Sequence, residues 1–223
     1  MTEKILADPY VPRLDTILFG EEEQAVIAAA LATQKPWNWK PGGGEEVTLT
    51  LVKGRIRDLH KERHGDRCCY CRFPLHGGGH FIVDPEHVLP KSRDSYRPLS
   101  FELWNLAIAC KRCNMRYKGQ KIDFVVDSAN AGSFQDSANY RLIHPNFDLY
   151  KDHILFRIEM NDDATLVKYT KRPGSDKGDY TYSYFNLQER EVDSFDAGQG
   201  RDVQAQVGTG ALEAQELAHQ FGQ

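Results

Sequence analysis

Long apolar stretches are missing from this 223-residue sequence. No run approaches the ~18 consecutive apolar residues that a membrane-spanning helix requires, and the first ten residues lack the basic-then-apolar order of a secretory signal. The chain also lacks a Walker loop, a dinucleotide-binding fingerprint, a serine-nucleophile elbow and internal repeats. We therefore expect a cytoplasmic protein, and its composition, 40% apolar and 27% charged, is that of an ordinary globular chain.

The net charge of −4 conceals an uneven distribution. The segment from Lys53 to Lys121 carries 15 Lys and Arg against 7 Asp and Glu, a local charge of +8. Because the whole chain has 28 basic and 32 acidic side chains, the remainder carries 13 and 25, or −12. This division predicts one segment that lies near anions, between acidic flanks. Uneven surface decoration without a function is the alternative interpretation.

All five cysteines fall in the basic segment, and four of them form two Cys-x-x-Cys motifs. Cys68 and Cys71 form the first, and Cys110 and Cys113 form the second, with 38 residues between the motifs. Each motif places two sulfurs on one tight turn, and two such turns complete a tetrahedral Zn²⁺ site. An odd number of cysteines without a secretory signal also favours metal binding over disulfide bonds. Cys69 has poor ligand spacing, and we expect a small buried side chain there.

The pattern of apolar residues and turn signals predicts an α+β fold. The expected division is an N-terminal helical segment and linker at 1–47, a core with the zinc site at 48–125, and a C-terminal hairpin and helical extension at 126–223. Helices are predicted over 20–34, 48–64 and from Cys110 to Gly119, short strands over 81–83 and 106–109, and a β-hairpin over 153–169. A further strand is predicted at 181–185, followed by a glycine-broken helical tail over 187–223.

Polar residues between and just after the cysteine motifs suit phosphodiester hydrolysis. They are Glu86, His87, Asn105 and Asn114. Hydrolysis requires an activated water and stabilisation of charge on the phosphate and the leaving oxygen. A neutral histidine can take the proton of the water, and carboxylate and amide oxygens can hold a hard divalent cation. Each of these residues also has a structural interpretation: Glu86 and His87 could be a surface pair, and each asparagine could cap a turn or a helix. Only the four together indicate hydrolysis.

The order of these motifs resembles that of the HNH endonucleases, which have a ββα-metal core. The matching stretches are CCYC (68–71), EHVLPKS (86–92), WNL (104–106) and CKRCN (110–114), followed by Lys118. The resemblance implies that His87 is the general base, that Asn105 orients it, and that Glu86 and Asn114 bind a catalytic Mg²⁺ or Mn²⁺. It also implies a structural Zn²⁺ on the four cysteines. Asn114 stands where many members have a histidine, and Asp84 could also reach the catalytic metal.

Short motifs outside the core resemble the HNH nuclease subunits of Septu and related retron-type anti-phage systems. These motifs are the HPNFD turn at 144–148, the predicted hairpin and the Phe-Asn-Leu segment at 185–187. In those systems the nuclease works with an ATPase. The resemblance therefore implies an antiviral defence function, an ATPase subunit as a partner, and nucleic acid, DNA more than RNA, as the substrate.

Two other functions remain open from the sequence. One is a zinc-stabilised nucleic-acid-binding module without catalysis, and the other is an adaptor that binds a protein partner through the acidic flanks. Further histidines and tryptophans favour structural interpretations. His76 and His80 flank a glycine turn, His144 belongs to a turn before the hairpin, and Trp37 and Trp39 suit a packing anchor.

Overall fold

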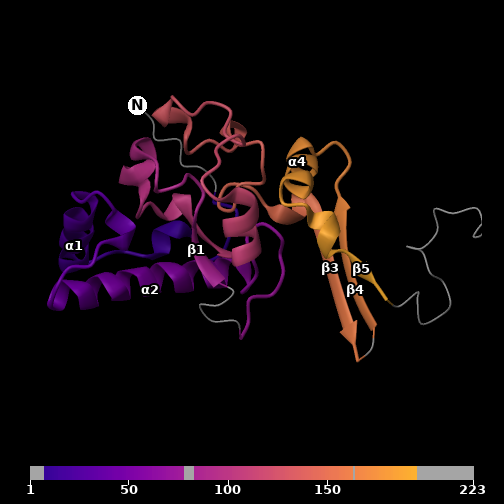
Figure 1. Ribbon diagram of the computed structural model, residues 1–223, viewed down its shortest axis with the longest axis horizontal. Coiled ribbons are helices and arrows are strands. Elements are labelled where there is room, and N and C mark those ends of the chain that lie inside the picture. Colours follow the sequence, from indigo (N-terminus) through magenta and orange to yellow (C-terminus); the bar gives the residue numbers. More distant parts are fainter. Residues whose placement is uncertain (1–7, 78–82, 163, 195–223) are drawn as a thin grey trace, which may run out of the picture. The chain divides into compact units, whose positions relative to one another are not determined.

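The computed structural model describes residues 8–77, 83–162 and 164–194, and Figure 1 shows its helices and strands. They are the helices α1 (Glu21–Leu31), α2 (Gly44–His64) and α4 (Asp176–Tyr184), the strands β1 (Val83–His87), β2 (Leu106–Cys110), β3 (Ile154–Asn161), β4 (Ala164–Lys171) and β5 (Val192–Asp193), and the π-helical segment η5 (Arg112–Lys118). Helices combined with small sheets confirm the predicted α+β class. None of the helices in these ranges is long and apolar enough to cross a lipid bilayer.

The chain divides into two compact units. The first comprises Met1–Leu155 and Thr170–Leu187, and the second comprises Phe156–Tyr169 and Gln188–Gln223, each over its described residues. The boundaries predicted after residues 47 and 125 both fall inside the first unit. The first unit therefore contains α1, α2, β1, β2, η5 and α4, and it holds every candidate site residue named above.

The two N-terminal helices form in the regions predicted for them. Glutamates at 21–23 occupy the first turn of α1, where the helix dipole favours negative charge. Helix α2 begins at Gly44, earlier than predicted, and ends at Gly65, whose φ of 61° is in the left-handed region that favours glycine. The helix α1 packs against α2, and their apolar side chains share one core with Phe101 and Leu106.

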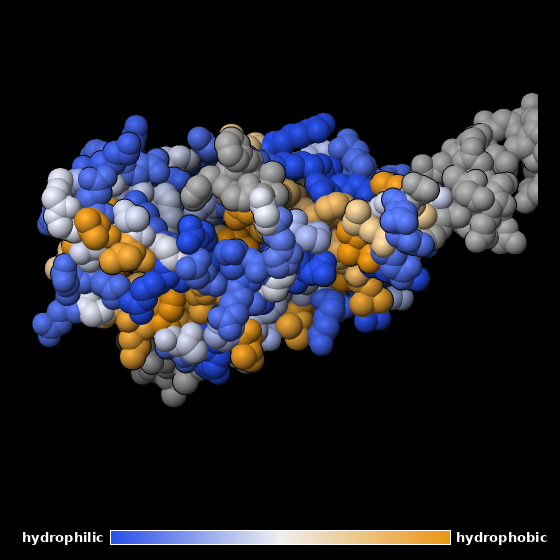
Figure 2. All heavy atoms as spheres, turned by 90° about the horizontal axis from the view of Figure 1, so that it is seen from below, coloured by the Kyte–Doolittle hydropathy of each residue, from blue (hydrophilic) through white to orange (hydrophobic). Residues whose placement is uncertain are grey.

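Helix α2 also presents apolar side chains to solvent. Val47 and Leu51 are each 61% exposed, and Figure 2 shows separate apolar patches among hydrophilic side chains on the face that includes α2. Single exposed apolar residues are ordinary on protein surfaces, so this face carries no functional argument by itself.

A two-stranded antiparallel sheet positions the candidate site. The register of β1 on β2 places Glu86 opposite Ala107 and His87 opposite Leu106, and α2 packs against β2. The second predicted strand is confirmed, whereas β1 begins at Val83 and continues to His87; residues 78–82 lie outside the described ranges. The segment η5 follows β2 directly and ends at Gly119, as expected.

The strand predicted at 181–185 is wrong, because this segment belongs to helix α4. Ser175 caps the helix by accepting a hydrogen bond from the backbone N–H of Gly178 at 3.0 Å. Tyr180 and Tyr184, four residues apart, stack with ring centroids separated by 5.5 Å. The aromatic residues that suggested a strand therefore belong to a helix, in which Tyr180 and Tyr184 share one face.

The predicted C-terminal hairpin is confirmed as β3 and β4, which lie next to each other in a three-stranded sheet of order β3-β4-β5. Strand β5 pairs antiparallel with β4, with Leu166 opposite Asp193 and Val167 opposite Val192. Of the predicted helical tail, only Leu187–Arg190 is helical in the described part, and residues 195–223 lie outside it.

Candidate metal centre and adjoining polar site

The four cysteines of the two predicted motifs lie together in space. The sulfur atoms of Cys68, Cys71, Cys110 and Cys113 are all within 4.8 Å of one another, and all but Cys110 are fully buried. A tetrahedron of ~2.3 Å Zn–S bonds separates its sulfurs by ~3.8 Å, and Sγ of Cys71 lies 3.8 Å from Sγ of Cys110. The cluster can therefore hold a metal ion such as zinc.

Local backbone bonds explain how the two motifs converge. The N–H of Arg72, in the left-handed region with φ 59°, donates to the carbonyl of Cys68 at 2.9 Å. The N–H of Cys68 donates to the carbonyl of Phe73 at the same distance, which closes the first turn. Strand β2 then brings Cys110 to this turn, where the backbone N–H of Cys110 donates to Sγ of Cys68 at 3.3 Å. The sheet therefore brings the second motif to the first.

Cys69 stands apart from this cluster, as the sequence predicted. It is 3% exposed, and its backbone N–H donates to the carbonyl of Ile108 in β2 at 3.0 Å. Burial raises the pKa of the Cys69 thiol well above its usual value, so the side chain stays a neutral thiol. Its role is packing between the first motif and the sheet.

Glu86 is fully buried and uses only one of its two carboxylate oxygens. Tyr70, inside the first cysteine motif, donates its hydroxyl to Oε1 at 3.0 Å, and Nζ of Lys118 lies 2.7 Å from the same oxygen. Oε2 is buried and has no hydrogen-bond partner among the described residues. Burial raises the pKa of Glu86 and the charge of Lys118 opposes that rise. The carboxylate is thus anchored through one oxygen and unpartnered at the other.

His87 ends β1, and the alternation of the strand turns it to the opposite face from Glu86. Its ring is nearly buried, with its edge against Trp37 at 4.9 Å between centroids. Nε2 lies 3.1 Å from the carbonyl oxygen of Ser100, so it carries the proton and Nδ1 carries the lone pair. Burial, with the positive charge of Lys91, holds the pKa of His87 well below its usual value. The ring is therefore a neutral imidazole at neutral pH.

Asn105 fixes the backbone that follows His87. Its Oδ1 accepts a hydrogen bond from the N–H of Leu89 at 2.7 Å, and its Nδ2 donates to the carbonyls of Leu89 and Leu99, both at 3.2 Å. Nζ of Lys118 donates to the carbonyl of His87 at 2.7 Å. The buried side chains of Asn105 and Lys118 thus fix the backbone at and just after His87.

Asn114 and Asp84 lie on the elements that flank Glu86. Asn114 is partly exposed in η5, whose π-helical winding is rare and frequent at functional sites. Asp84 shares one face of β1 with Glu86, and its carboxylate is 4.0 Å from Nζ of Lys111. Within the described ranges, the cysteines are the one group of three or more His, Cys, Asp or Glu side chains placed to share a metal ion.

Sequence reasoning assigned no role to Lys91, whereas Lys53 was among the basic residues of the helix predicted over 48–64, where phosphate contact and a solvated face were both open. Lys91 is close enough to His87, to Glu86 and to Lys53 to interact with each electrostatically, and burial lowers its pKa. Nζ of Lys53 lies 5.6 Å from the ring centroid of Trp37. The buried Trp37 confirms the packing anchor, but its position against His87 was not predicted. Because Lys and Arg are numerous between Lys53 and Lys121, no local signal separated these two lysines from the other basic residues.

Two further histidines of the sequence motifs, His144 and His76, lie in the described ranges. His144 is fully buried, and its backbone N–H donates to Asp148 at 2.7 Å. Asp148 forms an ion pair with Lys177 at 2.6 Å, which fixes the HPNFD turn as expected. His76 is exposed, and His80 lies outside the described residues.

The Phe-Asn-Leu segment is fastened to the metal-bearing part of the molecule. Phe185 stacks on Tyr70 with 4.3 Å between ring centroids. The guanidinium of Arg112, in η5, donates to the carbonyls of Phe185 at 2.9 Å and Asn186 at 2.8 Å. Tyr70 thus touches Glu86 through its hydroxyl and the C-terminal segment through its ring.

Comparisons with protein-family models, with curated proteins and with solved structures found no match to this chain. The function of this chain is therefore inferred from its motifs and from the geometry of its described residues.

Proposed function

We propose that this chain is a metal-dependent HNH endonuclease that hydrolyses phosphodiester bonds of nucleic acid, DNA more than RNA. In this proposal β1, β2 and η5 form the ββα-metal core, and the cysteine cluster holds a structural Zn²⁺. The observation that carries the proposal is the end of β1, where a neutral His87 adjoins Glu86 with its buried, unpartnered oxygen. Asn105 holds the backbone beside that histidine.

His87 acts as the general base in this mechanism. Because Nε2 donates to the carbonyl of Ser100, Nδ1 is the nitrogen that accepts the proton of the attacking water. The low pKa of the buried ring keeps it unprotonated at neutral pH, and the carbonyl of Ser100 stabilises the imidazolium that forms. Asn105 acts as a positioning residue, because it bonds the backbone after His87 rather than the ring.

Glu86 and Asn114 would hold the catalytic Mg²⁺ or Mn²⁺. When bound, such a cation supplies charge stabilisation to the phosphate and to the leaving 3′ oxygen. The buried Oε2 of Glu86, without a hydrogen-bond partner, fits an oxygen ligand of a hard cation. Lys118 and Tyr70 hold the other oxygen and so orient the carboxylate. Asp84, on the same face of β1, is a further ligand candidate.

Lys53 and Lys91 would bind the phosphate backbone. The charge of Lys91 acts on His87 and on Lys53, Lys53 lies over the ring of Trp37, and both lysines belong to the segment whose charge is +8. Binding through a few lysines releases counterions, so nucleic-acid affinity should fall steeply with salt. The acidic remainder of the chain would repel nucleic acid and so confine the substrate to the basic segment that contains Lys53 and Lys91.

One observation favours a second candidate, a zinc-stabilised nucleic-acid-binding or adaptor module without catalysis. Glu86 is fully buried and His87 is only 5% exposed. A catalytic pair must be reached by water and phosphate, whereas a structural pair needs no access. The two functions differ in whether removing the imidazole stops cleavage.

A cleavage assay on plasmid DNA, single-stranded DNA and tRNA with Mg²⁺ or Mn²⁺ tests the proposal. General-base catalysis contributes ~10²–10⁴-fold, so His87→Ala should lose cleavage by that factor while zinc content and DNA affinity stay unchanged. His87→Asn, which leaves a smaller void, should behave in the same way. His76→Ala, at an exposed histidine, is the matched control.

Equal cleavage by wild type and a folded, zinc-loaded His87→Ala protein would contradict this mechanism. If the wild type binds DNA but cuts none of the substrates with either metal, the non-catalytic candidate replaces the nuclease.

We also propose that the nuclease is the effector of an anti-phage defence complex with an ATPase subunit. The HPNFD turn and the Phe-Asn-Leu segment support this proposal through their resemblance to such nucleases, and the acidic flanks, with a charge of −12, support a role in partner binding. Co-expression with the ATPase should yield a stable complex that cuts faster than the isolated chain. Tight DNA binding and full cleavage by the chain alone at physiological salt would contradict it.

A further inference from the structure

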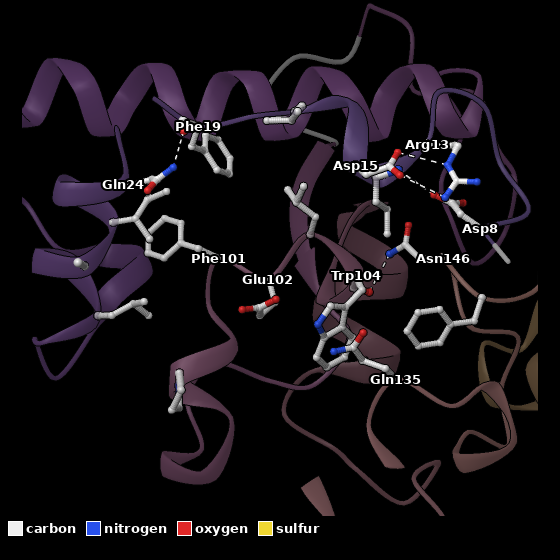
Figure 3. A pocket seen from close by; sticks show the side chains of 18 of the residues that line it. Asp8, Arg13, Asp15, Phe19, Gln24, Phe101, Glu102, Trp104, Gln135 and Asn146 are labelled. Carbon is white, nitrogen blue, oxygen red and sulfur yellow. Dashed lines mark hydrogen bonds and ion pairs between the residues drawn. The ribbon is translucent and has the colours of Figure 1, made fainter. Parts of the chain in front are cut away.

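A large cleft lies on the first unit, apart from the cysteine cluster and from Glu86. Its volume is about 1270 Å³, larger than the ~300–1,000 Å³ typical of small-molecule sites. In Figure 3 it runs from Gln24 and Phe19 at one end to Asp8 and Asn146 at the other, with Glu102 between them. A cleft of this size and length suits a polypeptide segment better than a metabolite.

The floor of the cleft is apolar and includes one face of α1. Ile27 and Leu31 on α1 lie one turn apart and line the cleft together with Phe19, Leu103 and Phe147. All five side chains are only partly buried in the described structure. An incompletely covered helix face beside aromatic side chains is the arrangement that receives the apolar face of an amphipathic helix.

The rim of the cleft carries negative charge that the protein does not neutralise. Arg13 pairs with Asp15 at 3.2 Å, so these two charges cancel. Glu102 and Asp136 are exposed and take part in no ion pair within the described ranges. Two uncompensated carboxylates above an apolar floor select a cationic partner and repel nucleic acid.

Trp104 provides an independent sign that the cleft receives a ligand. The residue is 8% exposed, and its indole Nε1–H has no hydrogen-bond partner in the described part of the chain. Figure 3 shows the indole nitrogen turned towards the side of the cleft on which Glu102 lies. A buried donor without an acceptor is costly, and an acceptor on a docked segment would satisfy it.

We propose that this cleft is the docking site for a cationic amphipathic helix of a partner protein. Its apolar face would cover α1 and the aromatic floor, its Lys or Arg side chains would meet Glu102 and Asp136, and a polar group would accept from Trp104. The tail of this chain at 195–223 is a poor occupant, because its four acidic and one basic residues give it the same sign as the rim. The proposal holds whether or not the chain is a nuclease.

The position of the cleft gives the docked helix a route to His87. Phe101, Glu102 and Leu103 line the cleft, and the preceding residue, Ser100, accepts the hydrogen bond from His87. Phe101 also packs on Trp37, with 5.3 Å between the ring centroids. Trp37 in turn contacts the His87 ring. An occupant that shifts this segment would therefore change the surroundings of the histidine.

Titration of the full-length, zinc-loaded protein with a synthetic helix tests the proposal. The probe is a peptide of about 15 residues with Leu on one face and Lys on the others, and the matched peptide has Glu at every Lys position. NMR resolves the indole N–H signals of the three tryptophans. We expect the Lys peptide to shift the Trp104 signal and the Glu peptide to leave it unchanged.

Variants separate docking from nonspecific attraction. Glu102→Gln with Asp136→Asn should weaken the Lys peptide about fivefold, whereas Asp58→Asn, at an exposed acid on α2, should leave binding unchanged. Trp104→Phe keeps an aromatic side chain and removes the donor, and it should weaken binding; thermal denaturation of the free variant gives the separate cost of its smaller ring.

Three outcomes would overturn the proposal. They are equal binding of the Lys and Glu peptides, binding without a shift of the Trp104 signal, and affinity unaffected by the Glu102 and Asp136 changes. Concentration-dependent dimerisation that Leu103→Glu abolishes would assign the cleft to a second copy instead. Cleavage by the isolated chain is measured separately, so failure of docking and failure of the nuclease are distinguishable.

Discussion

Two ion pairs of the first unit, each with a buried cation, differ in how completely their carboxylates are used. In Asp8–Arg63, both oxygens of Asp8 accept from the guanidinium at 2.8 Å, and each also accepts a backbone N–H, from Tyr10 or Leu14. In Glu86–Lys118, Oε1 receives both donors and Oε2 receives none.

The difference distinguishes a structural pair from one with spare coordinating capacity. Arg63 is fully enclosed and Asp8 ties the N-terminal segment to α2, so every polar atom of the carboxylate serves the fold. Glu86 keeps one oxygen buried and unpaired, at a cost in desolvation. A cation at that oxygen would remove the cost, which is why the proposed catalytic metal is assigned to Glu86 and not to Asp8.

Removing zinc should have the largest effect on stability, and this effect should extend to the ion pair between Glu86 and Lys118. Tyr70 links the first cysteine motif to Glu86, and structural zinc contributes ~10–16 kcal/mol to folding of small sites. We expect one zinc per chain, and after chelation, fast hydrogen exchange across β1, β2 and η5. Cys69→Ser should keep the zinc. Elemental analysis that finds well-folded protein without a metal would contradict this prediction.

Breaking the Asp8 pair should have the next largest effect. Asp8→Asn leaves the buried guanidinium of Arg63 without its counter-charge, and such losses cost ~3–5 kcal/mol. The free energy of unfolding, measured in urea, should fall by that amount at pH 7. Glu62→Gln, at an exposed acid of α2, should change it little. An effect of Asp8→Asn as small as that of the control would show that the pair is not structural.

A divalent cation should stabilise the protein through the site at Glu86 and not through Asp8. Mn²⁺ at 100 times its Kd should add about 2.7 kcal/mol to the free energy of unfolding of the zinc-loaded protein. Glu86→Gln should abolish this gain, because an amide is a weaker ligand of a hard cation, whereas Asp8→Asn should retain it. Thermal denaturation with and without Mn²⁺ measures the difference. An equal gain in the Glu86→Gln protein would place the cation elsewhere.

Lowering the pH should gradually reduce the free energy of unfolding through His60, whose ring is close enough to Arg63 to interact with its charge. Burial lowers the pKa of His60, on the same helix, to about 3. As the pH falls from 6.5 towards 3, the unfolded chain takes up a proton at this residue and the folded chain does not. The free energy of unfolding should therefore fall by up to about 1.4 kcal/mol per pH unit.

Urea denaturation across this pH window, compared between wild type and His60→Gln, isolates the contribution of this histidine. The slope should be shallower in the variant, and His76→Gln, at an exposed position, should keep the wild-type slope. Identical slopes in wild type and His60→Gln would mean that His60 is protonated in the folded protein.

Local patterns were sufficient for much of the fold. Apolar spacing predicted α2, an acidic first turn predicted α1, and short apolar runs predicted β2 and the β3–β4 hairpin, because each of these signals is local. The strand predicted at 181–185 failed because its aromatic alternation is also compatible with a helix, and the cap at Ser175 decided between them. The division into two units was not predicted, since it depends on contacts between distant segments.

The sequence by itself determined the metal cluster and the nearness of Glu86 to His87, because both depend on short spacings. Only the tertiary structure decided how these residues are used. The register of β1 on β2 and the winding of η5 bring Lys118 to Glu86 and to the carbonyl of His87, 31 residues away. The same packing encloses His87 and leaves Oε2 of Glu86 without a donor. No local pattern encodes such partnerships, because a buried polar atom is satisfied by whichever donor the fold brings within reach.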